Sequence, residues 1–403
     1  MKALRNYLNR IKPNFEPGGK LHSFQSVFDG FETFLYTPNT TSTSGVNIHD
    51  SLDSKRIMII VVLALMPCLL FGMYNTGYQN WLAAGATDFP FWQLMMYGFL
   101  AVLPRIVVAY VVGLGIEFAV AQWRREEIQE GFLVTGILIP LICPVETPLW
   151  MLAVATAFSV IFVKEVFGGT GYNVFNVALV TRAFLFFAYP AQMSGDKVFV
   201  SSGSILGLGY DLPDGFTGAT PLGQIASFAG DKLELLNLRG DVISTWDAFI
   251  GLIPGSFGET STLCILIGAA ILLATGIASW RIMLSVVAGG LLMGWIANVF
   301  ETSTYPASFL SPLDQLLYGG FAFAAVFMAT DPVTAARTGA GKYIYGLLVG
   351  VMAVLIRTYN NGYPEGAMLA VLLANALAPL IDHCVVQANV SRRMRRLKER
   401  AKA

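Results

Sequence analysis

The sequence predicts an all-α polytopic membrane protein with about ten transmembrane helices in two inverted five-helix repeats with broken helices. Of its 403 residues, 55% are hydrophobic and only 13% are charged, whereas soluble domains carry about 25% charged residues. Apolar runs recur along the chain at or near the length of about 20 residues that crosses the hydrocarbon layer. Two stretches of the sequence also resemble each other. Composition, run length and repetition together predict the fold class.

Ten apolar runs define the expected spans. Glycines and prolines interrupt the chain around the third and eighth runs, which are also short, and this is the pattern of a broken helix. The first run is preceded by a polar stretch of about 55 residues, in which the sequence predicts a cytoplasmic extension. The expected spans are 57–77, 94–121, 131–143, 149–167, 174–190, 263–279, 282–300, 316–330, 341–357 and 366–386.

Lysines and arginines next to the spans predict the orientation, because cytoplasmic loops carry the excess of these residues. With ten spans and the N-terminus inside, the basic residues near span ends all fall on the cytoplasmic side; they are Lys55, Arg56, Arg124, Arg125, Lys164, Arg281, Arg337, Lys342 and the tail SRRMRRLKERAKA. The expected parts are the cytoplasmic extension 1–55, the first membrane repeat 56–190, the periplasmic loop 191–262, the second membrane repeat 263–387 and the basic cytoplasmic tail 388–403.

The internal repeat rests on two matched pairs of segments. GFLVTGILIPLICPVETPLW followed by VFGGTGYNVFNVAL matches GGFAFAAVFMATDPVTAART followed by TYNNGYPEGAMLAVLLAN. Five spans per half is an odd number, so the halves would be inverted in the membrane, as in transport folds with sites near the repeat interface. Chance similarity between glycine-rich membrane segments is the alternative.

Acidic residues inside the apolar regions are candidates for function, since ionisable groups are costly in the membrane. Glu117 lies deep in the second span, just after Gly113 and Gly115, which we expect to allow close helix approach. Asp331 lies at the break after the eighth span, and Asp382 lies near the end of the tenth. Helix capping or a structural buried pair is the alternative for each carboxylate.

Two asparagines, Asn173 and Asn176, open the fifth span after the GGTGY turn. Their amides offer both donors and acceptors, and a helix N-terminus adds backbone N–H donors. This set suits a planar ligand with carbonyl and imide groups. A helix cap is again the simpler alternative.

Other classes of function find little support. The formal net charge is zero, so nothing draws the chain to nucleic acid. The four cysteines form no CxxC pair, which argues against disulfides, zinc and iron–sulfur clusters. The three histidines lie outside the loop 191–262, which argues against a protease or a metallohydrolase there. We therefore expect no metal ligands and no catalytic set in the chain itself.

The loop 191–262 contains the stretch DGFTGATPL, residues 214–222. A Gly-Ala-Thr segment is usually only a turn, although its hydroxyl, on Thr220, is open to a modifying enzyme. The stretch closely resembles the flavinylation motif S/T-G-A-T of ion-pumping flavoprotein subunits. KEVFGGTGYNVFN, DAFIGLIPGSFGE, GGFAFAAVFMATDPV and YPEGAMLAVLLANALAPLIDH resemble the B-subunit family of sodium-translocating NADH:quinone oxidoreductases. The resemblance covers nearly the whole chain, and the related D subunits of Rnf complexes share the motif.

The resemblance implies two flavins. Thr220 would carry FMN through a phosphoester, attached by a separate flavin transferase that uses FAD. Asn173 and Asn176 would lie at a noncovalent riboflavin. The protein would position both flavins and tune their electronics.

The resemblance also implies a quinone site and an ion path. Gly113, Leu114 and Glu117 match the Gly-Gly-x-x-Glu stretch of the family's ubiquinone site, with Leu114 in place of the second glycine. Asp331 and Asp382 match acidic residues linked to Na⁺ uptake, although H⁺ would need only the same carboxylates.

The implied complex has six subunits in the bacterial inner membrane. NADH would be oxidised on another subunit, and electrons would pass through FMN and riboflavin to ubiquinone while Na⁺ is exported. An Rnf-type electron-transfer subunit is one alternative. A flavin-free secondary transporter with the same inverted repeat is another, and it predicts an unmodified Thr220.

Overall fold

The computed structural model describes residues 2–16, 18–19, 25–36, 44–46, 54–124, 131–193, 198–213, 216–228, 234–302, 304–360 and 362–402. Within these ranges the regular structure is helical, and the only β-type pairings are two isolated bridges in the loop after α7. The predicted all-α class is confirmed. Asp214 and Gly215, which begin the DGFTGAT motif, lie outside the described residues.

The first half of the chain forms one set of long and broken helices. A π-helical segment, η3, continues α6 without a break. The elements are α1 (Lys2–Ile11), η1 (Lys12–Asn14), α2 (Gln25–Leu35), α3 (Ser54–Ala83), α4 (Phe91–Arg124), α5 (Phe132–Ile142), α6 (Leu149–Ser159), η3 (Val160–Glu165) and α7 (Val177–Ala188).

The second half follows a loop that holds only short helices. The eighth predicted span, 316–330, is the most fragmented, and it ends in a second π-helical segment, η6. The elements are η4 (Pro190–Gln192), α8 (Pro221–Ala226), α9 (Thr245–Ile250), α10 (Thr262–Ala274), α11 (Trp280–Val299), η5 (Pro306–Phe309), α12 (Asp314–Leu317), α13 (Phe321–Phe323), η6 (Ala324–Met328), α14 (Gly339–Tyr359) and α15 (Ala367–Lys402).

Five of the described helices, α3, α4, α11, α14 and α15, are long and apolar enough to cross a membrane, and α5, α7 and α10 are shorter apolar helices. Large apolar side chains are exposed on the outer faces of the long helices, Val111 at 67% and Trp295 at 61%. Such faces suit lipid rather than water, because lipid tails are as apolar as these side chains and no hydrophobic effect drives their burial there. The chain is thus a polytopic membrane protein, while the count of ten spans and the inversion stay predictions.

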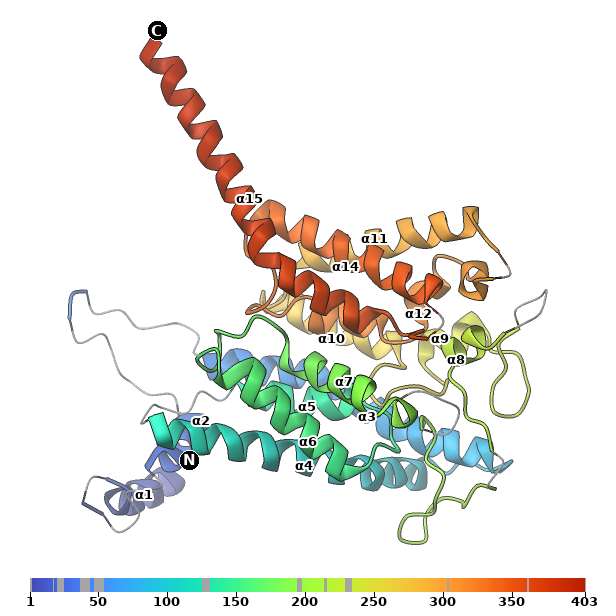
Figure 1. The fold of residues 1–403 in the computed structure, drawn as a ribbon. Helices are drawn as coiled ribbons and strands as arrows, with labels where there is room; N and C mark the ends of the chain where they lie inside the picture. Colours follow the sequence, from blue (N-terminus) through green and yellow to red (C-terminus); the bar gives the residue numbers. More distant parts are fainter. Residues whose placement is uncertain are drawn as a thin grey trace.

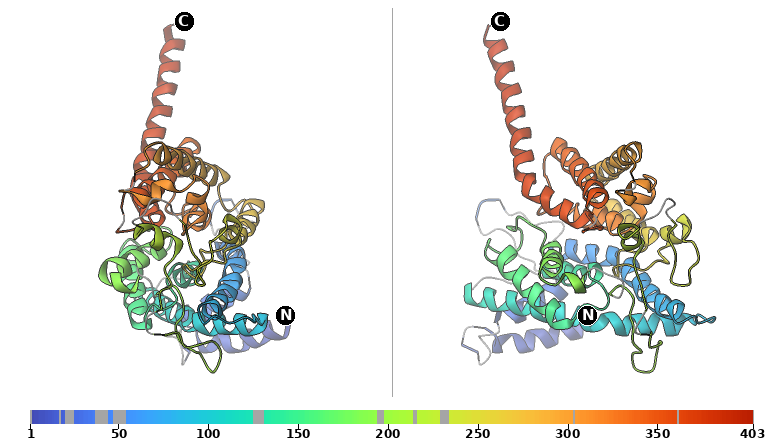
Figure 2. Two further views of the ribbon diagram at one scale, coloured as in Figure 1. Left: turned by 90° about the vertical axis from the view of Figure 1, so that its right-hand side faces the viewer. Right: turned by 45° about the vertical axis from the view of Figure 1, so that its right-hand side comes forward.

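The helices of the two halves pack in a similar order. In the first half α4 packs on α5 and α6, and α6 packs on α7. In the second half α11 packs on η6 and α14, and α14 packs on α15. Contacts between α3 and α10 join the two sets, and one continuous apolar core runs through both. Figures 1 and 2 show the sets side by side, the first in blue to green and the second in yellow to red.

The long helices run between two ends of the molecule. In Figure 1, α1, α2 and the C-terminal part of α15 lie towards the left, and α8, α9 and the loop around them lie at the right. The predicted basic tail, 388–403, is helical as far as Lys402, because α15 continues without interruption. The charged side chains of this part of α15 are compatible with a solvated helix, and Arg395 pairs with Glu399. The helix can therefore continue beyond the membrane surface.

Candidate functional site

A pocket lies between the two halves at the end that holds the start of α3 and the end of α10. We call it the polar pocket. Its cavity volume is about 100 Å³. Its apolar wall includes Ile57, Met58, Val61, Val134, Leu138, Leu272 and Phe327, and its polar lining is Thr135, Lys164, Thr170, Asn173, Asn176, Thr330 and Asp331. It therefore unites both predicted riboflavin residues with one predicted ion-path residue.

A glycine-rich turn brings the asparagines to this pocket. Gly168, Gly169 and Gly171 have φ values of 116°, 94° and 91°, a region that residues with a Cβ rarely adopt. The turn reverses the chain between η3 and α7. It leaves Asn173 half-buried, with its amide donating to the carbonyl of Phe175 at 2.9 Å.

Asn176 is both the cap of α7 and a bridge between the halves. Its Oδ1 accepts hydrogen bonds from the backbone N–H groups of Ala178 and Leu179 at 3.1 and 3.3 Å. Its Nδ2 donates to Oδ2 of Asp331 at 3.3 Å. The capping alternative therefore holds, and one amide hydrogen remains available to a ligand, because an asparagine Nδ2 carries two.

Asp331 lies just after η6, in the break of the second half. Its Oδ1 accepts from the N–H of Val333 at 3.1 Å, and its Oδ2 accepts from Oγ1 of Thr334 at 3.0 Å as well as from Asn176. Each oxygen of a carboxylate has about two acceptor positions, so Oδ1 keeps the capacity for one more donor or a cation.

Asp382 is not in the polar pocket. Its Oδ2 accepts from the N–H of Arg337 at 2.7 Å, and its Oδ1 accepts from the N–H and hydroxyl of Thr338 at 3.0 and 2.5 Å. It anchors the segment before α14 to α15. Asp331 thus begins the segment 331–338 and Asp382 binds its end, and Asp382 is not among the residues that line the polar pocket.

Glu117 on α4 forms a buried ion pair with Lys164 on η3, and both side chains are 5% exposed. One oxygen, Oε1, accepts from the ammonium, and Oε2 has no hydrogen-bond partner within the described part of the chain. Lys164 also lines the polar pocket. The side chain of Lys164 thus connects Glu117, the predicted quinone residue, to the cavity that holds the two asparagines.

The glycines before Glu117 behave differently from each other. A Cβ on Gly113 would overlap the ring of Phe132, so this glycine does allow α4 and α5 to approach closely. Gly115 is exposed and has open space around it, so the expectation of close packing there is wrong. Leu114, at the position of the family's second glycine, is half-buried and packs against the core.

Thr220 lies at the opposite end of the molecule, where it is the N-cap of α8 rather than part of a free turn. Its Oγ1 accepts from the N–H of Gly223 at 3.0 Å, and the residue is half-buried. It lines a small cavity of about 20 Å³, which we call the Thr220 pocket, together with Ser256, Glu259 and Glu365. The geometry leaves the hydroxyl partly accessible.

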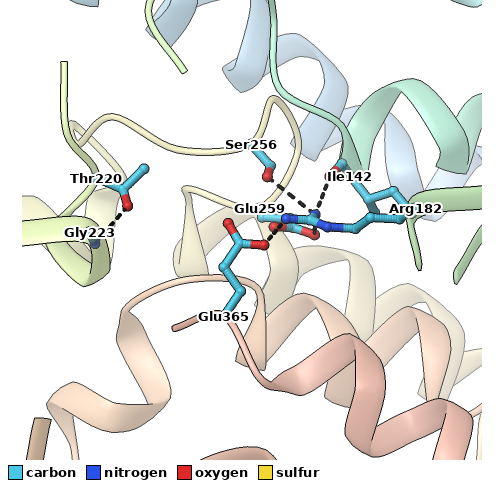
Figure 3. Close-up of polar contacts among 7 residues, drawn as sticks. All are labelled: Ile142, Arg182, Thr220, Gly223, Ser256, Glu259 and Glu365. Carbon is cyan, nitrogen blue, oxygen red and sulfur yellow. Dashed lines mark hydrogen bonds and ion pairs between the residues drawn. The ribbon is translucent and has the colours of Figure 1, made fainter. Parts of the chain in front are cut away.

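A buried charge cluster forms the inner wall of the Thr220 pocket. Figure 3 shows Ser256, Glu259 and Glu365 turned towards the guanidinium of Arg182. Nη1 of Arg182 donates to Oε1 of Glu259 at 3.0 Å, to Ser256 at 3.3 Å and to the carbonyl of Ile142, while Nη2 pairs with Glu365. Arg182 is 2% exposed and comes from α7, and both glutamates precede helices of the second half.

Sequence reasoning missed Lys164 and the two glutamates as parts of a site. From its position in the sequence Lys164 indicates only the orientation of a span, and Glu259 and Glu365 lie in loops where a carboxylate looks solvated. A usable signal was present, since an arginine inside an apolar helix, Arg182, requires partners, and glutamates beside apolar runs are the available ones. Within the described residues no group of three or more His, Cys, Asp or Glu side chains could hold a metal ion.

Comparisons with known proteins show which family the chain belongs to. Residues 41–391 match the model of the NQR2, RnfD, RnfE family. The chain is 44% identical to a protein of Chromohalobacter salexigens over 98% of its own length and 97% of that protein. It is 43% and 42% identical to proteins of Pseudomonas aeruginosa and Klebsiella pneumoniae, again over 98% of its length. All three are named as the B-subunit of a Na(+)-translocating NADH-quinone reductase. The chain therefore belongs to the NQR2, RnfD, RnfE family.

Proposed function

We propose that this chain is the flavin-carrying membrane subunit of a Na⁺-translocating NADH:quinone reductase. It would accept electrons onto FMN bound covalently at Thr220, pass them through riboflavin to ubiquinone, and couple this transfer to Na⁺ export. The relatives named as the B-subunit of such an enzyme support the proposal. The observation that carries it is the polar pocket, which joins Asn173, Asn176 and Asp331 with the lysine that binds Glu117.

The polar pocket has the chemistry that riboflavin requires. Apolar side chains such as Met58 and Phe327 offer walls for the ring system, and amides, hydroxyls and one ammonium offer donors and acceptors for the imide edge and the ribityl hydroxyls. A cavity of about 100 Å³ holds several water molecules, so its walls would separate to admit the ring. Bound flavin supplies one- and two-electron chemistry, while Asn173 and Asn176 orient it.

Thr220 fits a covalent phosphoester that points outwards. The cavity on its inner side, about 20 Å³, has room for about one water molecule. It is also bordered by Glu259 and Glu365, whose carboxylates already pair with Arg182. The FMN ring would therefore lie on the outer surface, where another subunit of the complex can reach it.

The two sites are separated by the length of α10. Thr260, just before this helix, lines the Thr220 pocket, and Leu272, near its end, lines the polar pocket. At about 1.5 Å per residue the separation along α10 is about 20 Å. A route from FMN to riboflavin would thus run across the membrane part of the chain, and Glu117, paired with Lys164, would receive ubiquinone near the second flavin.

The orientation and partners complete the proposal. Both termini would be cytoplasmic and the loop 191–262 periplasmic in the bacterial inner membrane, following the Lys and Arg distribution. Other subunits of a six-subunit complex would oxidise NADH and deliver electrons, and a flavin transferase would load Thr220. Asp331, with acceptor capacity in the polar pocket, and Asp382, which lies on α15 and accepts from Thr338, would lie on the Na⁺ path.

Peptide mass spectrometry of the chain purified from its native host tests the covalent flavin. We expect the mass of one FMN less one water on the peptide that contains Thr220. Thr220→Ser should keep both the cap and the flavin, and Thr220→Val should lose both, whereas Thr217→Val should retain the flavin. An unmodified Thr220 in a host that has its flavin transferase would favour the flavin-free transporter. Failure of ubiquinone reduction in a flavinylated complex would favour the Rnf-type role.

A further inference from the structure

Lys164 belongs to two sites at once. It projects from η3 and pairs with Glu117 on one side, and it lines the polar pocket on the other. It is 5% exposed, so water screens its charge only weakly. One buried cation is therefore shared between a carboxylate at the predicted quinone site and the cavity with the two asparagines.

Stability alone explains this pair poorly. Burying two charges costs several kcal/mol per ion, and apolar replacements are often as stable. Oε2 of Glu117 also has no hydrogen-bond partner within the described residues. The pair therefore lacks the additional hydrogen bonds that stabilise a buried ion pair. Lys164 lies in a π-helical segment, a feature frequent at functional sites, and the other such segment, η6, leads directly to Asp331.

We propose that Lys164 sets the reduction potential of the flavin in the polar pocket. Its ammonium supplies the positive charge that faces the negative charge gained there when an electron arrives from the flavin on Thr220. No bond is made or broken in the protein. The inference rests on the proposed function, which places riboflavin in this pocket.

Glu117 has the opposite effect on the reduction potential of the flavin, and it acts through Lys164. The Glu117 carboxylate draws the Lys164 ammonium away from the cavity and cancels part of the ammonium's field. The reduction potential of the flavin is therefore raised less than it would be by an unpaired lysine. The only other charged group that lines the cavity in the described part of the chain is Asp331. Without Lys164 the one charged group lining the pocket in the described part of the chain would be the Asp331 carboxylate, and an added electron would be disfavoured.

Redox titration of the noncovalent flavin in the whole complex tests this role. The variants are Lys164→Gln, Lys164→Arg, Glu117→Gln and Glu117→Gln with Lys164→Gln. Arg124→Gln is the matched control, because Arg124 lies at the same end of α4, pairs with Glu165 at 3.7 Å and does not line the pocket. Riboflavin is first extracted and quantified from every preparation.

We expect Lys164→Gln to lower the reduced-to-oxidised ratio at a fixed potential at least tenfold, which is about 59 mV for one electron. Lys164→Arg should stay near the parent value, and Glu117→Gln should shift the potential upwards. If Lys164→Gln loses its flavin, the double variant is compared with Glu117→Gln, because the two differ only in the lysine. We expect the double variant to lie lower by the same tenfold change.

A midpoint that matches the Arg124→Gln control, in variants that retain riboflavin, would overturn the role of Lys164 and leave the proposed function intact. Absence of extractable riboflavin from the parent complex would instead overturn the proposed riboflavin site, and this inference with it. The two failures are thus distinguished before any activity is measured.

Discussion

At the scale of single residues, Arg182 is a buried cation whose charge is balanced by two carboxylates. It is fully buried and relies on Glu259, Glu365, Ser256 and one backbone carbonyl for its hydrogen bonds. Its partners come from both halves of the chain, so the cluster fastens the halves together beside Thr220. Removing a member leaves charge buried without a partner, which costs about 3–5 kcal/mol.

Arg182→Gln should therefore lower the thermal unfolding temperature of the purified complex and weaken the packing around Thr220. Arg182→Lys should recover only part of the loss, because an ammonium lacks the planar fork of donors. A thiol-reactive dye can follow unfolding, since Cys68 and Cys143 are buried. The exposed pair Arg395–Glu399 gives the control, Arg395→Gln, for which we expect almost no change. Equal unfolding temperatures for Arg182→Gln and Arg395→Gln would contradict the stabilising role of the cluster.

Residue types alone could not assign roles to the predicted site residues. Asn176 is a cap and a pocket residue together, and Asp382 is an anchor for Thr338. Capping and ligand binding use the same polar groups, so sequence cannot separate them. The pairing of Lys164 with Glu117 depends on how α4 and η3 pack, and no local pattern encodes it.

At the scale of elements, α4 and α5 approach each other closely at Gly113. Gly113→Ala would place a methyl group against the ring of Phe132, which is fully buried. We expect a loss of about 1–3 kcal/mol, as for other overpacked cores. Gly115→Ala is the control on the same helix, where open space and helix propensity predict a neutral or slightly stabilising effect.

Unfolding temperature and the KM for ubiquinone would be measured for both glycine variants. Adding Phe132→Leu to Gly113→Ala should restore part of the stability, because it removes the clash. A Gly113→Ala variant as stable as Gly115→Ala would show that α5 can move away freely, and would contradict the close packing of α4 on α5.

Helix positions were predictable where apolar runs are long and unbroken. The predicted span 94–121 lies inside α4, and 282–300 nearly coincides with α11. The fragments α12, α13 and η6 were less predictable, because Gly319, with a φ of 65°, interrupts the helix inside the predicted span. The helical tail of α15 was missed, since charge is compatible both with a helix and with an irregular tail.

At the scale of the whole molecule, the positions of the ends can be tested against the membrane. Ser391 is exposed near the end of α15, and Ser202 is exposed in the loop after α7. In a chain whose Cys264 and Cys384 are replaced by serine, Ser202→Cys should react with an impermeant maleimide in cells whose outer membrane is permeable to the reagent. Ser391→Cys should react only after the inner membrane is opened. Labelling in the reverse order would invert the proposed orientation.

The fold class was predictable at this scale because the membrane imposes composition and run length on every span. The polar pocket was only partly predictable. The repeat pointed to an interface between halves, and the asparagines and Asp331 do meet there. What joins them to Glu117 is a contact across helices, and Thr220 is a cap whose inner neighbours come from three distant loops.

The segment 331–338 works as a short tether. At one end, Asp331 accepts a hydrogen bond from Asn176 at the polar pocket, and at the other end Thr338 donates to Asp382 on α15. Eight residues cannot span more than about 29 Å. The segment therefore limits how far Asp331 and the residues bound to Asp382 can move apart. Thermodynamic reciprocity then applies: if occupancy of the pocket by a flavin alters the affinity of Asp382 for a cation, the cation must alter the affinity of the pocket by the same factor.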